Sequence, residues 1–174
     1  MKKVVIFVVG IGLFLSLSIL AAGAATTTPD TVACEGNVLR FPPSDRLDPM
    51  PIGDIKFDLG NVPPDRKFVV GKIYRVEFGS NKRNLHFNFY TFFTKWDGAK
   101  VEMFYFPVKS PGVPTLDCQA GEAGSYACKI RGALLNPDRL LTFRENGRIT
   151  MKFLEQENDL VPVGEVPVPP AQSK

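Results

Sequence analysis

Alternating apolar and polar side chains run through the centre of this chain, a pattern typical of strands that bury one face. Ile73 to Phe78 alternates cleanly, with Arg75 and Glu77 on the polar face. Leu85 to Phe93 and Ile149 to Phe153 repeat the same period of two. We therefore predict a strand over each of these three ranges.

Turn signals separate the strands at hairpin spacing. Gly79 to Asn84 is a polar turn, and the Asp-Gly pair within Trp96 to Ala99 is a strong hairpin signal. Lys100 to Val108 follows as a further strand. Glu155 to Asp159 is expected to turn the chain into a last strand, Leu160 to Val168, whose prolines suit an edge or a bulge.

Only one short stretch suggests a helix. Ala133 to Leu141 could form one, although Pro137 interrupts it. Several short strands at hairpin spacing, with no long stretch of helical period, predict an all-β fold. The pattern fits an antiparallel sandwich or a sheet closed on itself.

Some strands are apolar on both faces. Within Leu85 to Phe93, Tyr90 and Phe92 oppose the face that carries Phe87, and Met103 to Phe106 is apolar throughout. A tightly packed sandwich needs only one apolar face per strand. The surplus could cover an edge, form an interface, or line a cavity between splayed sheets that holds an apolar ligand. The pattern alone leaves these three alternatives open.

The N-terminal residues predict a secretory signal peptide. Lys2 and Lys3 precede an apolar stretch, Val4 to Leu20, and Ala22-Gly23-Ala24 supplies the small-x-small pattern that signal peptidase needs. Val4 to Ala25 is nearly long enough to anchor the chain in a membrane, but small residues end the stretch and no Lys or Arg follows closely. We expect cleavage near Ala24 and secretion into an extracellular space.

The mature chain is long enough for one domain with a hydrophobic core. We expect a signal peptide at 1–25, a short linker at 26–33, one domain at 34–168 and a Pro-rich tail at 169–174. The leader holds two of the 21 Lys and Arg and none of the 18 Asp and Glu, so the mature chain is close to neutral. Near neutrality argues against nucleic acid as a partner, because phosphate binding needs a concentrated basic surface.

Three cysteines lie in the mature part. Cys118 and Cys128 flank a short loop, Gln119 to Ala127, whose Gly, Ala and Ser residues allow it to turn back. With an export signal, this spacing predicts a disulfide. Cys34 is left over, either buried and reduced or paired with another chain in a homodimer.

Catalytic and metal-binding residues are scarce. His86 is the only histidine, and within a strand it is more often structural or exposed than a catalytic base. One His and three Cys do not make a tetrahedral metal site when two of the Cys are bonded to each other. Glu77 and Glu102 could be proposed as a carboxylate pair for glycoside hydrolysis, but both alternate with apolar neighbours, as solvated strand positions do. We therefore expect no enzyme activity, no cofactor and no metal.

Several short motifs occur in a characteristic order. The strand Leu85-His86-Phe87-Asn88-Phe89-Tyr90 precedes Cys118-x9-Cys128, which has Tyr126 just before and Lys129-Ile130 just after its second cysteine; Gly147 to Leu154 and Glu165 to Val168 follow. This order resembles the ML (lipid-recognition) domain family and spans roughly Cys34 to Val168. Members usually bond their first cysteine to one in the last strand, whereas Leu160 to Val168 contains none, and a further early disulfide is also absent.

The resemblance implies an immunoglobulin-like antiparallel β-sandwich of two sheets that part to hold a sterol, a fatty acid or another lipid. Such a protein transports or presents lipid and performs no chemistry. Its partners would be the lipid and, as an open alternative, a membrane surface or receptor. Lys82 and Arg83 are rim candidates. The lipid-binding side chains would be the inward ones: Tyr74, Val76, Phe78, Leu85, Phe87, Phe89, Met103, Tyr105, Ile149, Met151 and Phe153.

A different class of function is the alternative, namely an extracellular carbohydrate- or protein-binding β-sandwich without a lipid cavity. His86-Phe87-Asn88 is similar to the sugar-binding strand of galectins, although the expected arginine is missing and Phe89 replaces a proline. Trp96 could stack on a sugar ring, but a lone Trp beside a turn more often packs in a core.

Overall fold

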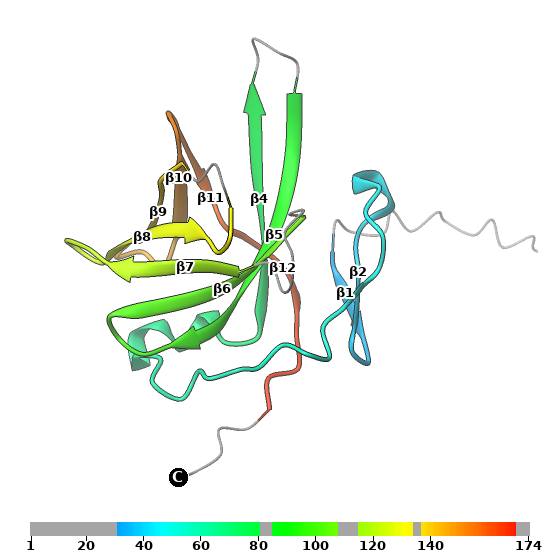
Figure 1. Ribbon diagram of the computed structural model, residues 1–174, viewed down its shortest axis with the longest axis horizontal. Helices are drawn as coiled ribbons and strands as arrows, with labels where there is room; N and C mark the ends of the chain where they lie inside the picture. Colours follow the sequence, from blue (N-terminus) through cyan, green and yellow to red (C-terminus); the bar gives the residue numbers. More distant parts are fainter. Residues whose placement is uncertain (1–30, 81–84, 108–114, 134–136, 170–174) are drawn as a thin grey trace, which may run out of the picture.

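The computed structural model describes residues 31–80, 85–107, 115–133 and 137–169, with the side chains of residues 80 and 85–87 left out. Within these ranges the chain forms two antiparallel sheets and two short 3-10 helices (Figure 1). The prediction of an all-β antiparallel fold with two sheets is confirmed. The sheets differ greatly in size, since one has three strands and the other nine.

The small sheet has the order β1-β2-β3, and the large one the order β11-β10-β9-β8-β7-β6-β5-β4-β12. The elements are β1 (Ala33–Glu35), β2 (Val38–Arg40), η1 (Pro43–Asp45), β3 (Met50–Pro51), η2 (Pro64–Val69), β4 (Lys72–Ser80), β5 (Leu85–Trp96), β6 (Lys100–Phe106), β7 (Thr115–Ala120), β8 (Ser125–Ile130), β9 (Arg139–Phe143), β10 (Ile149–Phe153), β11 (Gln156–Asp159) and β12 (Val161–Glu165). From β4 to β11 each strand pairs with the next one in the chain. Among the described strands this meander contains none of the Greek-key connections of an immunoglobulin-like sandwich.

The large sheet curls until its two ends meet. Its terminal strands, β11 and β12, are consecutive parts of the chain separated only by Leu160. β11 pairs with β10, whereas β12 pairs with β4 at the far end of the strand order. The Leu160 N–H donates to the Ile149 carbonyl, 2.8 Å away, where the chain changes partner. We call this unit the curled sheet.

Inward-facing side chains of the curled sheet form one cluster, the inner core. In β5 a bulge between Phe93 and Lys95 shifts the alternation by one residue, so that Trp96 joins Phe93 on the inner side. Buried members of the inner core are Val62, Val69, Tyr74, Val76, Phe78, Phe89, Phe93, Trp96, Val101, Met103, Tyr105, Leu116, Cys118, Tyr126, Cys128, Ile130, Leu141, Ile149, Met151 and Leu160.

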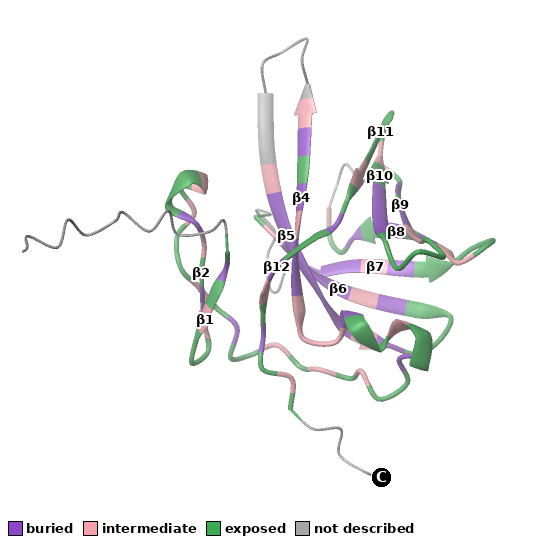
Figure 2. Cartoon of the chain, turned by 180° about the vertical axis from the view of Figure 1, so that it is seen from behind, coloured by how far each residue is buried: buried purple, intermediate pink, exposed green. Residues whose placement is uncertain are grey.

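A second cluster, the outer core, explains why β5 and β6 are apolar on both faces. Segment 32–57, which includes the small sheet, packs on the outward side of the curled sheet (Figure 1). Phe41 lies 4.8 Å from Tyr90 and Phe57 lies 5.9 Å from Phe92, measured between ring centroids. Consecutive buried positions therefore run along the central part of β5 (Figure 2). The outer core comprises Val32, Leu39, Ile52, Ile73, Tyr90, Phe92, Phe104, Val163 and Val166.

Polar contacts and a close backbone approach fix this covering segment. Asp45 accepts hydrogen bonds from the Tyr90 hydroxyl and from Asn88 Nδ2, the latter at 2.9 Å. The Val32 N–H donates to the Val163 carbonyl at 2.8 Å. A Cβ at Gly164 would lie 2.3 Å from the Val32 carbonyl oxygen, so only glycine permits this approach.

Three sequence predictions need correction. Residues 139–143 form β9 and not the end of a helix, because Arg139 and Leu141 alternate inward beside β10. Residues 156–159 form β11 and not a turn, since they pair with β10. Val32 and Ala33 belong to the fold and not to a linker, because Val32 is buried against β12. The signal peptide, linker residues 26–30 and residues 170–174 lie outside the described residues.

Candidate functional site

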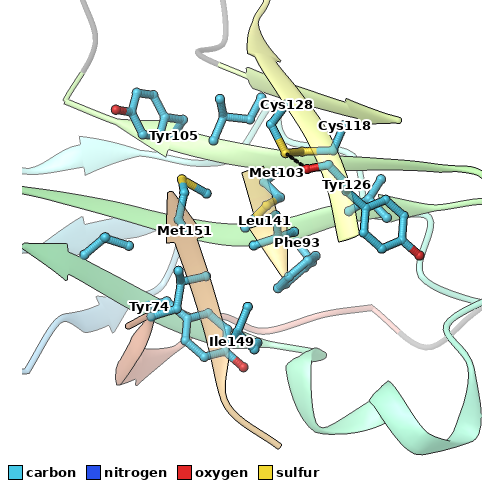
Figure 3. Packing of buried hydrophobic residues seen from close by; sticks show 14 of the residues in the cluster. Tyr74, Phe93, Met103, Tyr105, Cys118, Tyr126, Cys128, Leu141, Ile149 and Met151 are labelled. Carbon is cyan, nitrogen blue, oxygen red and sulfur yellow. Dashed lines mark hydrogen bonds between the residues drawn. A yellow bond between two sulfur atoms is a disulfide. The ribbon is translucent and has the colours of Figure 1, made fainter. Parts of the chain in front are cut away.

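The predicted lipid-binding side chains converge inside the curled sheet. Nine of the eleven are described, and all nine belong to the inner core or pack against it, as Figure 3 shows for Tyr74, Met103, Tyr105, Ile149 and Met151. The other four are Val76, Phe78, Phe89 and Phe153. The inward phase of the alternation was thus predicted correctly. The side chains of Leu85 and Phe87, and the rim candidates Lys82 and Arg83, lie outside the described residues.

Aromatic rings fill the interior at one end of the curled sheet. Phe89 lies 4.5 Å from Tyr105 and 5.3 Å from Phe78, and Phe78 lies 5.5 Å from Phe153, measured between ring centroids. At these separations the rings contact one another. This part of the interior is therefore occupied by the protein's own side chains.

A cation lies among these rings. Arg139 is 6% exposed, and its guanidinium carbon lies 4.7 Å from the Phe153 ring centroid and 5.6 Å from that of Tyr105. Arg139 Nη1 donates to the Pro137 carbonyl at 3.0 Å. Burial raises the pKa of the Tyr105 hydroxyl, and the charge of Arg139 opposes that rise. Arg139 was not predicted from the sequence, although its spacing from Leu141 places both residues on one face of β9.

Arg66 from η2 packs over the aromatic rings at the opposite end of the curled sheet. Its guanidinium carbon lies 4.6 Å from the Phe143 ring centroid and 5.8 Å from that of Trp96, and its Nη1 donates to the Tyr126 hydroxyl at 3.1 Å. Trp96 is fully buried beneath this contact. The expectation that Trp96 could stack on a sugar ring is therefore wrong, because no face of the indole reaches the surface.

An apolar hollow of about 430 Å³ lies at this same end, where β4, β10 and β12 begin beside η2. Its wall includes Phe68 and Val161, which are 43% and 47% exposed. Tyr74 and Ile149, both from the predicted set, also line it. The complete lining is Phe68, Lys72, Tyr74, Gly147, Arg148, Ile149, Asp159, Leu160, Val161 and Pro162. The hollow thus connects the inner core with the surface.

Tyr74 brings a hydroxyl group to the lining of this hollow. The residue is only 4% exposed, and its ring stands edge-on to Phe93 with centroids 6.2 Å apart. Figure 3 shows its hydroxyl beside Ile149, at the end of the ring that points away from the disulfide. No hydrogen bond of this hydroxyl occurs within the described part of the chain. Burial raises the pKa of Tyr74 to about 12, so the hydroxyl stays neutral at ordinary pH.

Two ion pairs border the hollow. Lys72 pairs with Glu165, which forms no part of the lining, and that contact lowers the pKa of the glutamate. Arg148 Nη2 contacts both carboxylate oxygens of Asp159, at 2.7 and 2.8 Å. Each lining cation therefore has a carboxylate partner.

A larger hollow of about 940 Å³ lies on the outward side of β9, β10 and β11 and is mostly polar. Arg144 pairs with Glu157, and the Thr150 hydroxyl donates to the same carboxylate at 2.6 Å. Both contacts lower the pKa of Glu157, and the hydrogen bond from Thr150 has the larger effect. A polar surface whose charges are already paired offers little apolar area to an apolar ligand.

The predicted disulfide is present. Cys118 and Cys128 face each other directly across β7 and β8 and are bonded on the inner side. Cys34 is free and half-buried in β1. No group of three or more potential metal ligands occurs in the ranges that the structure describes. Within those ranges, too, no helix has the length and apolar character needed to cross a membrane.

Comparisons of the chain with protein-family models, with curated proteins and with solved structures find no match. The resemblance to the ML domain therefore stays a prediction based on its motifs. The function must be argued from the inner core and the hollow that opens from it.

Proposed function

We propose that this protein is an exported lipid-binding protein that holds a sterol, a fatty acid or another lipid for transport or presentation. The lipid lies with its apolar part in the hollow, and the inner core forms the floor beneath it. The hollow itself carries the proposal, because it joins an apolar surface opening to two members of the predicted lipid-binding set, Tyr74 and Ile149.

The size and chemistry of the hollow support this function. Its volume of about 430 Å³ falls within the range of about 300–1,000 Å³ that small-molecule sites usually have. Phe68 and Val161 are large apolar side chains left partly exposed at its mouth, next to the buried Leu160. Covering such side chains with a lipid chain removes apolar surface from water, which favours binding.

The hollow lies beside η2, whereas the sequence predicted a lipid cavity in the middle of the fold. Around Phe78, Phe89 and Tyr105 the rings already contact one another, so a lipid could enter that region only by displacing them. The hollow beside η2 needs no such movement. We therefore place the ligand there and assign the deeper residues a packing role.

The test is recovery of bound lipid. The whole chain is expressed in a secretory host with an oxidising pathway, purified without detergent, and extracted with organic solvent for mass spectrometry. We expect a lipid in about stoichiometric amount. Phe68→Ser should lower its recovery, because Phe68 forms part of the wall. Leu140→Ser is the matched control, since Leu140 is similarly exposed but lies on β9 outside the hollow.

Repeated recovery of protein without lipid, combined with failure to bind added lipids, would refute the function. Equal losses in the Phe68 and Leu140 variants would instead refute the placement. Cleavage of the leader is tested in the same preparation by the mass of the secreted chain, which should begin near Thr26.

A further inference from the structure

We propose that the hollow selects a neutral ligand with an apolar chain and one hydroxyl group, such as a long-chain alcohol, and that the Tyr74 hydroxyl binds that group. This inference rests on the proposed function and specifies the ligand class. From the sequence, Tyr74 was predicted only as one of the side chains that line an apolar lipid site.

The hydrogen-bonding state of the Tyr74 hydroxyl favours a ligand that carries a hydrogen-bonding group. Tyr74 lines the hollow and is almost wholly buried in the inner core, and its hydroxyl has no hydrogen-bond partner in the described part of the chain. A buried polar group that lacks a partner destabilises the fold, so such groups usually meet water or a ligand. Water can satisfy the hydroxyl when no ligand is bound. A ligand that excludes this water must supply a hydrogen-bonding group in its place.

The charges around the hollow favour a neutral ligand. The cations that line it are Lys72 and Arg148, and these already pair with Glu165 and Asp159. Neither pair leaves an unmatched positive charge within the described lining. A carboxylate buried here would lose its hydration without gaining a counter-ion, which is costly.

The protonation state of Tyr74 suits an alcohol as its hydrogen-bonding partner. Burial keeps the Tyr74 hydroxyl neutral far above physiological pH, and a neutral phenol both donates and accepts a hydrogen bond. An alcohol has the same two capacities. The pair can therefore satisfy each other without any net charge in the apolar surroundings of Ile149 and Leu160.

Three ligands of equal chain length test the inference, namely decan-1-ol, decanoate at pH 8 and 1-chlorodecane. Affinity is measured by displacement of the neutral fluorescent dye N-phenyl-1-naphthylamine from the whole secreted protein. The wild type should bind decan-1-ol more tightly than either of the others. Tyr74→Phe should weaken decan-1-ol binding about fivefold, the effect of one net hydrogen bond. The same change should leave 1-chlorodecane binding unaltered.

Tyr126→Phe is the matched control, because the Tyr126 hydroxyl contacts Arg66 and does not line the hollow. It should leave the order of affinities unchanged. If wild-type protein binds none of the three ligands, the proposed function fails together with the inference. If it binds them but Tyr74→Phe affects all equally or none, or if decanoate binds best, the function stands and the inference is overturned.

Discussion

The covering segment 32–57 should contribute strongly to the stability of the curled sheet, and Leu39→Ala tests this. Leu39 lies in β2 with no exposed surface, and it belongs to the outer core together with Tyr90 and Phe92. Replacing a fully buried leucine by alanine removes apolar contacts and leaves a cavity, at a cost of about 2–5 kcal/mol. We expect about 3 kcal/mol, because the surrounding rings of the outer core cannot collapse fully into the space.

The change should appear in urea denaturation followed by the fluorescence of Trp96. This residue is the only tryptophan and lies in the inner core, so its signal reports unfolding of the curled sheet itself. With a denaturant dependence of about 2 kcal/mol per molar urea, the midpoint should fall by about 1.5 M. Val38→Ala is the matched control on the same strand, and its half-buried side chain predicts a loss below about 1 kcal/mol.

The reactivity of the Cys34 thiol provides a second probe on the covering segment itself. If the segment and the curled sheet unfold together, Cys34 labelling and Trp96 fluorescence should change at the same urea concentration. A midpoint shift below about 0.3 M for Leu39→Ala, or labelling of Cys34 well before the fluorescence changes, would refute the reasoning. The segment would then be a detachable cover and no part of the cooperative fold.

Two further predictions concern the end of the curled sheet near η2. Arg66→Ala should destabilise the protein by about 2 kcal/mol, because it removes the contacts with Phe143 and Trp96 and the hydrogen bond to Tyr126. Its measure is again the urea midpoint, and a shift no larger than that of the exposed-site variant Arg40→Ala would contradict it. Tyr74 should make the fold sensitive to alkali. The pKa of its hydroxyl is about 12 in the folded chain and near 10 in the unfolded chain. Its contribution to the free energy of unfolding is therefore complete below pH 10 and declines as the pH rises towards 12. Tyr74→Phe should therefore lose less stability than the wild type between pH 10 and 12, and parallel stability curves would refute the assignment.

Local patterns in the sequence were sufficient for β4, β5, β6, β10 and β12 and for the inward face of the first four, but not for the other strands. Alternation with a period of two depends only on neighbouring residues, so the positions of Tyr74, Met103 and Met151 could be predicted without knowledge of the fold. The disulfide was equally local, because a ten-residue separation between Cys118 and Cys128 fits a hairpin. The bulge that brings Trp96 inward was not predicted. One extra residue there reverses the inward and outward alternation of the following side chains, and the sequence carries no evident signal of it.

The tertiary structure decided what covers each face. The apolar side chains of Tyr90 and Phe92 were compatible with packing against a ligand, against another chain or against the protein itself. Only the fold shows that Phe41 and Phe57, from a distant segment, pack on these two rings. It also decided where the interior opens. The hollow exists because η2, β10 and β12 meet beside Tyr74, and that meeting depends on long-range pairing that no local period encodes.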